Sequence, residues 1–252
     1  MTWNIEGYSR SSLEIRQIVD SYTPSLLFIS EPWLFLSDLK VATQLLTPQY
    51  KMFLNSDDLY NPDLPLLKSR AHGGTLTLWK AELDPYITIL PTQTSRILPI
   101  LLDYPGYQQT IHVNIYLPTS GRESDFIESL ASLQATIDHA NESYPSALIY
   151  VKGDANACSS PRPNNKRDLV FHQFIQDNAF LPLCFNSHKT YHHFLGSGVS
   201  DSSIDVALSS TASSDGTPSA SSEILLAVLC SKVKTRTFNS HHDAIITRIL
   251  LR

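Results

Sequence analysis

Cysteine is scarce in this sequence, and long apolar runs are absent. The three cysteines, Cys158, Cys184 and Cys230, are scattered without a CxxC pair, which argues against a disulfide framework or a zinc finger and favours a reducing compartment. The longest apolar stretch, Ile224 to Cys230, is far too short to span a bilayer. The first residues also lack the basic flank and the apolar core of a signal peptide. We therefore expect an intracellular protein with no membrane contact.

Positive charge is scarce as well. Nineteen Lys and Arg residues against 24 Asp and Glu residues give a formal net charge of −5, so any contact with nucleic acid must come from local patches. The 42% of hydrophobic residues is enough for a core of ordinary size and excludes a disordered tail. Because no internal repeat or shift in composition divides the 252 residues, we expect a single domain over residues 1–252.

Short apolar runs typical of strands alternate with three helical stripes. The stripes begin near Ile15, Phe126 and Val170, and the second follows Ser120-Gly121-Arg122-Glu123, which has the form of a capping box. The expected strands cover residues 2–5, 26–29, 75–79, 86–90, 97–102, 110–116, 147–151, 204–208, 224–229 and 244–251. Many strands with few helices along the whole chain favour a sheet-rich α/β sandwich.

Polar side chains stand where several of these apolar strands end. Each has an ordinary explanation: Glu31 before Pro32 is typical of a solvated strand end, and Gly153-Asp154-Ala155-Asn156 is typical of an Asx turn. Asp205 could bond a neighbouring backbone amide. The whole set consists of Asn4, Glu31, Tyr116, Asp154, Asn156, Asp205 and His242.

A sheet delivers such side chains to one edge, where this set would suit phosphoryl chemistry. Glu31 and Asp154 could supply the oxygen ligands that Mg²⁺ prefers. Asp154 could activate a water, Asn156 could hold a phosphoryl oxygen, and His242 could stabilise charge in the transition state. A zinc site around His241 and His242 is the weaker alternative, because no second His or Cys pair stands at ligand spacing nearby.

Taken in chain order, these residues resemble the motifs of the endonuclease/exonuclease/phosphatase superfamily. The motifs are Trp3-Asn4-Ile5-Glu6-Gly7, Ser30-Glu31-Pro32-Trp33, Gly73-Gly74, Tyr116-Leu117-Pro118, Gly153-Asp154-Ala155-Asn156, Ser203-Ile204-Asp205 and Ser240-His241-His242-Asp243-Ala244-Ile245. They span nearly the whole chain, which makes the set far more specific than any one motif. Within the superfamily, the Glu-Pro-Trp sequence and the run from His188 to Asp205 are most similar to the apurinic/apyrimidinic-like endonuclease domain of non-LTR retrotransposons.

The resemblance implies a four-layered, DNase I-like α/β sandwich, in which two mixed sheets pack face to face with helices outside. It also implies a site at one edge of the sandwich. There, Glu31 would bind a divalent metal, usually Mg²⁺ with Mn²⁺ as the alternative, and Asn4 would assist it.

Roles for the remaining site residues follow from the same resemblance. Asp154 would position or deprotonate the attacking water, and Asp205 would orient the imidazole of His242, which faces the phosphate. Asn156 would hold the scissile phosphate. Tyr116 would contact a phosphate or the leaving group.

The resemblance further implies contacts with double-stranded DNA. Thr190 and Ser202 match polar positions that contact the DNA backbone, and Lys189 and Tyr191 flank Thr190 as further candidates. Residues 191–200 could form a protruding hairpin that probes a groove. Local basic groups flank the site in sequence, as a rim that follows phosphates requires: Lys152, Lys166, Arg167, His188, Lys189, Lys232, Lys234 and Arg236.

One position departs from the family pattern. The family usually has Ser-Asp-His in its last motif, whereas this chain has Ser240-His241-His242. The replaced aspartate is assigned to metal binding or charge balance, so its loss bears on metal affinity and on any second metal. Asp243 could replace the carboxylate by a small shift of the turn.

The residues and the resemblance together predict a Mg²⁺-dependent DNA endonuclease. It would nick one strand of double-stranded DNA and leave a 3′ hydroxyl that primes reverse transcription of a non-LTR retrotransposon. We expect a reverse transcriptase domain in a longer polyprotein and action in the nucleus. Two alternatives stay open: a phosphatase or abasic-site repair nuclease of the same fold, and a catalytically silent copy that only binds DNA or protein.

Overall fold

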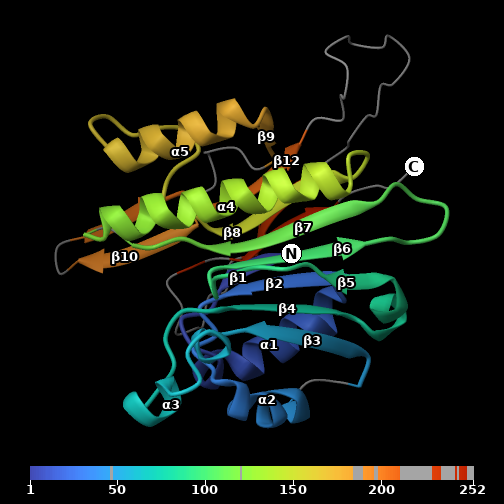
Figure 1. Ribbon diagram of the computed structural model, residues 1–252. Helices are drawn as coiled ribbons and strands as arrows, with labels where there is room; N and C mark the ends of the chain where they lie inside the picture. The colour runs from blue at the N-terminus through green and yellow to red at the C-terminus, as the bar shows by residue number, and fades with distance from the viewer. Residues whose placement is uncertain are drawn as a thin grey trace.

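Two six-stranded mixed β-sheets pack face to face in the computed structural model, with helices on their outer faces (Figure 1). The structure describes residues 1–45, 48–119, 121–183, 190–195, 198–210, 229–233, 242 and 244–248. This is the predicted four-layered, DNase I-like α/β sandwich. Among the described residues, no helix combines the length and the apolar character that a membrane span requires.

The first sheet, sheet A, carries the N-terminal half of the chain and its last strands. Its strand order is β13 (Leu229–Val233), β14 (Ala244–Arg248), β1 (Thr2–Asn4), β2 (Leu26–Ser30), β4 (Thr75–Lys80) and β3 (Tyr50–Asn55). β1 and β2 are parallel and are joined by helix α1 (Tyr8–Tyr22), while the other neighbours are antiparallel. Helix α2 (Leu39–Leu45) and the short helix α3 (Leu64–Leu67) lie in the connections that follow β2 and β3.

The second sheet, sheet B, carries the middle of the chain. Its strand order is β5 (Ile87–Ile89), β6 (Ile97–Leu102), β7 (Thr110–Tyr116), β8 (Leu148–Asp154), β12 (Asp205–Ser210) and β9 (Phe180–Pro182). β7 and β8 are parallel and are joined by helix α4 (Glu123–Ser143), and helix α5 (Lys166–Asp177) precedes β9. A separate hairpin of β10 (Tyr191–Leu195) and β11 (Gly198–Ser202) has the position and form that the sequence suggested.

Apolar stripes attach the helices to the sheets. In α1 the stripe includes Ile15, Ile18 and Val19, which belong to a buried cluster with sheet A. The stripes of α4 and α5 belong to the corresponding cluster of sheet B. Figure 1 shows α4 and α5 on one outer face of the sandwich and α1 and α2 on the other. The three predicted helices are therefore confirmed, and α2 and α3 are additions.

Polar bonds tie the two sheets together near the edge where the site lies. The Asn114 amide on β7 donates to the carbonyls of Ile29 (3.1 Å) and Leu76 (3.2 Å) across the sandwich. The Ser30 hydroxyl donates to the Ile115 carbonyl at 3.0 Å. Since parallel strands end at a common edge, these bonds hold the ends of β1 and β2 against those of β7 and β8.

One local prediction needs correction, and another falls mostly outside the described residues. The expected capping box is wrong, because α4 begins at Glu123 with Arg122 as its N-cap, and Glu123 accepts a bond from Arg167 Nη2 at 3.0 Å instead. The strand expected at residues 224–229 is described only from Leu229 onward, as β13; residues 224–228 lie outside the described part of the chain. The start of α4 thus depends on a contact distant in sequence, and helix boundaries are the least certain part of a sequence-based prediction.

Candidate active site

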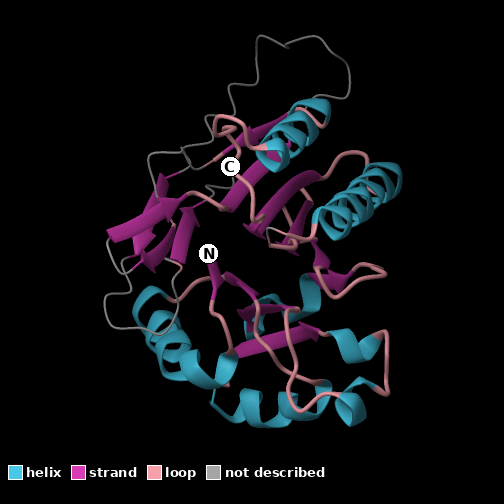
Figure 2. Ribbon diagram, turned by 90° about the vertical axis from the view of Figure 1, so that its left-hand side faces the viewer, coloured by secondary structure: helices cyan, strands magenta, loops and turns pink. Residues whose placement is uncertain are grey.

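The predicted polar residues meet at one edge of the sandwich, the edge that faces the viewer in Figure 2. Asn4 ends β1 and Glu31 directly follows β2, while Tyr116 ends β7 and Asp154 ends β8. Asp205 begins β12 and pairs in register with Asp154. Asn156 lies two residues past β8, and His242 lies two residues before β14. Strand register thus gathers residues from the two ends of the chain, as the sequence analysis predicted.

Asn4 links the two halves of the site. Its Nδ2 donates to Glu31 Oε1 and to Asp154 Oδ2, both at 2.8 Å. Its Oδ1 accepts from a backbone amide, which orients the side-chain nitrogen toward the carboxylates. As placed, Asn4 therefore positions the carboxylates, and it could offer an oxygen to a metal only if its amide turned over.

Local backbone geometry fixes Glu31. It adopts a left-handed conformation (φ 54°), and its amide donates to the Gly74 carbonyl at 3.1 Å. Its Oε2 accepts from Trp33 Nε1 at 3.0 Å. Gly7 has φ 113°, and a Cβ there would approach Trp33 Cε3 to 2.8 Å, so glycine is required where α1 begins beside this tryptophan.

Glycine is also required directly before Asp154. Gly153 has φ 136°, and a Cβ at this position would lie 2.1 Å from the Ile115 carbonyl oxygen. The absence of a side chain lets β8 pair closely with β7. This explains the Gly-Asp pair physically, beyond the ordinary Asx turn.

A buried carboxylate–imidazole–carboxylate row forms the deepest part of the site. His242 Nδ1 donates to Asp205 Oδ2 at 2.9 Å, and His242 Nε2 lies 4.0 Å from Asp154 Oδ2. Asp154, His242 and Asp205 are only 1%, 4% and 6% exposed. Trp3 Nε1 donates to the His242 carbonyl at 3.0 Å, and the ring of Tyr191 lies 4.9 Å from the imidazole. The imidazole is thus held from several sides.

Burial and mutual charge shift the protonation of this row. Burial raises the pKa of Asp154, the Asp205 charge raises it further, and His242 and the bonds from Asn4 and Asn156 only partly oppose this. Burial alone lowers the pKa of His242, but the charge and hydrogen bond of Asp205, followed by the charge of Asp154, outweigh burial and raise it. His242 is therefore an imidazolium near neutral pH, next to a carboxylate with a raised pKa.

Tyr116 and Asn156 lie next to Asp154 and are the remaining predicted residues of the site. Burial, followed by the charges of Glu31 and Asp154, raises the pKa of Tyr116, so its hydroxyl stays protonated and can donate a hydrogen bond. Asn156 has φ 48°, its amide donates to Asp154 Oδ1, and its Nδ2 donates to the Leu117 carbonyl, both at 2.8 Å. Asn156 therefore holds the Asp154 turn, and its predicted contact with a phosphate stays a prediction.

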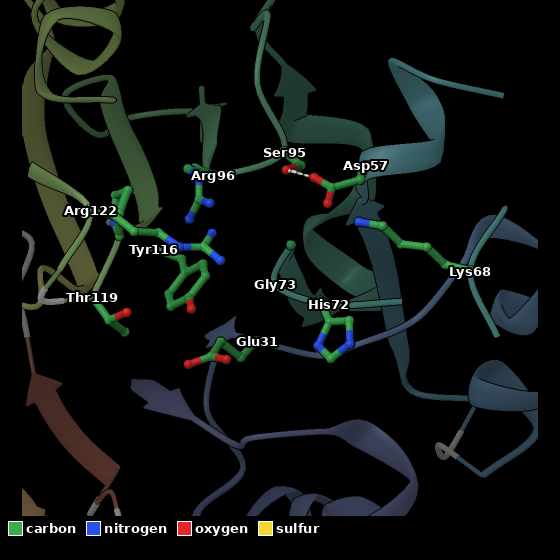
Figure 3. Close-up of a pocket in the computed structure, with 12 residues that line it drawn as sticks. Glu31, Asp57, Lys68, His72, Gly73, Ser95, Arg96, Tyr116, Thr119 and Arg122 are labelled. Atoms are coloured by element: carbon green, nitrogen blue, oxygen red, sulfur yellow. Dashed lines mark hydrogen bonds between the residues drawn. The ribbon is translucent and has the colours of Figure 1, made fainter. Parts of the chain in front are cut away.

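A basic cavity opens beside Glu31 and Tyr116. Its volume is about 360 Å³. The acidic and basic residues that line it are Glu31, Asp57, Lys68, His72, Arg96 and Arg122. Figure 3 shows Arg96 and Arg122 on one side of the Tyr116 ring and His72 and Lys68 on the other. The Arg96 guanidinium carbon lies 5.3 Å from the centre of that ring.

The sequence analysis missed these basic residues. Arg122 stood in the expected capping box, and Lys68, His72 and Arg96 belong to connections without a motif. Only the tertiary structure brings them to one cavity.

The predicted DNA-binding residues have different surroundings. Thr190 is 2% exposed, and its Oγ1 accepts from the Asp205 amide at 3.3 Å, which places it behind Asp205. Tyr191 is half-buried against His242. Ser202 pairs with Tyr191 in the β10–β11 hairpin, and nothing is described of its side chain. Lys189, His241 and Asp243 lie outside the described residues.

The donor set suits a hard divalent cation. The carboxylates of Glu31 and Asp154 lie on either side of the Asn4 amide. Ligand atoms of Asp154, Asp205 and His242 lie within 4.8 Å of one another, but His242 as an imidazolium has no lone pair to offer a metal. Burial, followed by the Asp205 charge, raises the pKa of Asp154, and a nearby cation would stabilise the ionised carboxylate. The residues present therefore fit a metal such as Mg²⁺.

The fold and this edge site define the class as the endonuclease/exonuclease/phosphatase fold. The endonuclease domain of TRAS1, a telomere-specific non-LTR retrotransposon, matches with a TM-score of 0.70 at 12% identity, over 100% of this chain and 97% of that one. The AP endonuclease LMAP from Leishmania major matches with a TM-score of 0.71 at 16% identity, over 98% of this chain and 85% of that one.

A third similar structure is the 3′ phosphatase NExo from Neisseria, bound as a variant to a product DNA hairpin. Its TM-score is 0.68 at 13% identity, over 99% of this chain and 98% of that one. No protein-family model matches the chain, and no curated protein matches it significantly in sequence. At these identities the likenesses define the fold.

Proposed function

We propose that this chain is a metal-dependent DNA endonuclease that nicks one strand and leaves a 3′ hydroxyl, which primes reverse transcription of a non-LTR retrotransposon. The observation that carries the proposal is the Asn4 bridge between Glu31 and Asp154, beside the Asp205–His242 pair and a basic cavity. Similar structures include a retrotransposon endonuclease domain and a DNA-bound 3′ phosphatase.

Glu31 would hold the metal, and Asn4 would keep the carboxylates of Glu31 and Asp154 in place. When bound, a divalent metal neutralises phosphate charge and lowers the pKa of water. The chain's own residues then account for orientation and for proton transfer.

The protonation states of Asp154 and His242 indicate which role each has in phosphodiester hydrolysis. Asp154, the carboxylate with a raised pKa, accepts the proton of the attacking water as its oxygen forms a bond to phosphorus. The bond from phosphorus to the 3′ oxygen breaks, and that oxygen takes up one proton from solvent water. His242 stays an imidazolium because of Asp205, and it stabilises negative charge that develops on the phosphoryl oxygens. Tyr116 donates a hydrogen bond to the same phosphate.

Relaxation of supercoiled plasmid tests the proposal. We expect nicked circles with Mg²⁺, none with EDTA, and a loss of about 10²–10⁴-fold in Glu31→Gln and Asp154→Asn. Glu128→Gln changes an exposed carboxylate on α4 and should nick like the unaltered protein. DNA ligase should reseal the nicks, because sealing requires a 3′ hydroxyl and a 5′ phosphate.

Competing substrates separate this function from its alternatives. The rate of hydrolysis should be at least as high on plain duplex DNA as on an abasic oligonucleotide, a 3′-phosphorylated oligonucleotide or inositol phosphates. If the protein hydrolyses one of these other substrates faster, its function is that of the corresponding repair nuclease or phosphatase and the proposed endonuclease activity is wrong. A folded sample that is inactive on all of them in Mg²⁺ and in Mn²⁺ would favour the silent copy.

A further inference from the structure

The connection between β3 and β4 projects from the edge of the sandwich that holds the site. This segment, residues 57–72, is called the β3–β4 excursion below. It contains the 3₁₀ turn Asp57–Leu59 and helix α3 (Leu64–Leu67). Figure 1 shows α3 standing out from the body at the edge where the β10–β11 hairpin also projects.

Two adjacent leucines form the tip of the excursion. Leu66 is 85% exposed and Leu67 is 74% exposed. Single exposed leucines are normal on a protein surface, but an adjacent pair on a projection favours a contact surface.

The base of the excursion is firmly attached. Asp58 is buried, and its Oδ2 accepts from the Leu36 amide at 2.9 Å. The Tyr60 hydroxyl donates to Asn55 Oδ1 at 2.8 Å. At the other end Ala71 is buried again. Both ends of the projection are therefore anchored in the fold.

The tip itself is stiffened. Pro62 and Pro65 restrict the backbone before and within α3. Backbone amides of Leu66 and Lys68 donate to the Asp63 and Leu64 carbonyls, both at 3.0 Å. The two leucines are thus presented on a preorganised turn, which reduces the entropy lost when they bind.

Positive charge follows the leucines and leads into the site. Lys68, Arg70 and His72 come next, and no acidic residue occurs between residues 64 and 74. Lys68 and His72 line the basic cavity next to Glu31. The Arg70 guanidinium carbon lies 5.1 Å from the centre of the Trp33 ring, whose Nε1 bonds Glu31. Lys68 and Arg70 therefore put positive charge on the side of the tip that leads to the site, where a phosphate backbone could bind, while Asp63 lies on the other side of the leucines in sequence.

The reacting groups lie deep, which sets a requirement for the substrate. Asp154 and His242 are almost completely buried, and a straight duplex presents its phosphates on a smooth cylinder. A kinked duplex can push one phosphate further into the site. Apolar side chains that insert between base steps produce such kinks.

We propose that the β3–β4 excursion is a DNA wedge: Leu66 and Leu67 insert between base pairs and kink the duplex beside the cleaved phosphate. Lys68 and Arg70 bind the backbone next to the kink. This inference rests on the proposed endonuclease function and specifies its substrate as duplex DNA in a bent form.

The test compares the double variant Leu66→Ser/Leu67→Ser with Leu13→Ser, which changes a leucine of similar exposure (76%) on α1. Nicking is measured on an intact duplex and on the same duplex with a two-nucleotide bulge, which is already kinked. We expect the double variant to lose about 10-fold or more on the intact duplex and to recover on the bulged duplex. Leu13→Ser should cut both normally.

Bending is measured separately from cleavage. In an Asp154→Asn background, fluorescence transfer between dyes at the two duplex ends should rise when the protein binds. The rise should be absent with the added Leu66→Ser/Leu67→Ser changes. Thermal melting of each variant checks that it is folded.

The possible results distinguish a failure of the wedge proposal from a failure of the proposed nuclease function. Equal nicking and bending of the intact duplex by the double variant overturns the wedge and leaves the nuclease intact. An equal loss on intact and bulged DNA also overturns the wedge, because the leucines would then act in general binding or in docking of a protein. If the unaltered protein binds neither duplex, the proposed function fails and the wedge fails with it.

Discussion

The candidate site has two halves that differ in their exposure to solvent. The closed half consists of Asp154, Asp205 and His242, which are nearly inaccessible. The charge of Asp205 raises the pKa of both Asp154 and His242. The open half is the basic cavity beside Glu31 and Tyr116, lined by side chains such as Arg96 and Arg122 (Figure 3). Asn4 joins the halves through its bonds to Glu31 and Asp154.

This difference separates two tasks. Proton transfer needs groups whose pKa values are displaced, and burial beside a charge displaces them. Binding a polyanion needs accessible cations, which act at long range and are weakened by salt. Changes in the closed half should therefore alter the chemical step, and changes in the open half should alter substrate binding.

The largest effect is expected for Asp154→Asn in the closed half. The variant keeps the shape but removes the proton acceptor, so kcat for nicking should fall about 10³-fold with little change in KM. Asp177→Asn, an exposed change on α5, serves as the control. A rise in KM with an unchanged kcat would mean that Asp154 only binds substrate.

A smaller effect is expected for Asp205→Asn, about 10²-fold in kcat. In the unaltered protein the pKa of His242 is raised to about 10, because Asp205, followed by Asp154 and Glu6, outweighs the effect of burial; the imidazolium therefore persists until the pH rises through that value. Without Asp205, burial lowers the pKa of His242. The alkaline limb of the pH–rate profile should therefore move to lower pH. An alkaline limb that stays in place would show that Asp205 does not control this imidazolium.

In the open half, Arg96→Gln and Arg122→Gln should each raise KM about 10-fold while kcat changes little. The dependence of log binding constant on log salt should lose about one unit of slope for each change. Arg16→Gln on α1, where the side chain is 59% exposed, is the matched control. If the slope of log binding constant against log salt concentration is unchanged, the cavity does not bind DNA phosphates.

The smallest effect on activity is expected for Lys152→Met, which tests burial behind the closed half. Lys152 is buried between the sheets, with its Nζ 5.2 Å from the Phe28 ring centre and 5.3 Å from that of Tyr150. Burial lowers its pKa from 10.5 to about 8. From about pH 8 to 10.5 the unfolded chain binds a proton that the folded chain lacks, so stability rises with pH in that window.

Lys152→Met should therefore stabilise the protein by about 3 kcal/mol at pH 7, because the pKa falls from 10.5 to about 8 and each pKa unit corresponds to about 1.36 kcal/mol. The gain should shrink as the pH rises from about 8 to 10.5. Thermal unfolding at several pH values measures it. A destabilised variant at pH 7 would show that the contacts of Lys152 with the two rings outweigh the cost of its burial.

Several site residues were predictable because they stand at the ends of apolar strands. Asp154 in the closed half and Glu31 beside the open half interrupt local patterns, and parallel strands deliver such residues to one edge. The 2.9 Å bond from His242 to Asp205 was inferred only through the family resemblance. Thr190 behind Asp205 was not predicted, because its burial depends on strands paired far apart in sequence.

The open half was hardly predictable. Arg96 and Lys68 lie in connections whose local sequence resembles an ordinary solvated surface. The capping box predicted around Ser120 and Glu123 was wrong, since Glu123 binds Arg167 of α5, which is distant in sequence. Leu66 and Leu67 matched no pattern either, and only the structure shows how exposed they are.

The sequence by itself determined most of the strands, the three main helices and the order of the polar residues next to the strand ends. These follow from periodicity and turn chemistry, which act over a few residues. The tertiary structure alone decided which charges meet, how deeply they are buried and where the cations of the cavity gather. Electrostatic shifts depend on distance and burial in space, so residues as far apart as Asn4 and His242 acquire their chemistry only when the two sheets have packed.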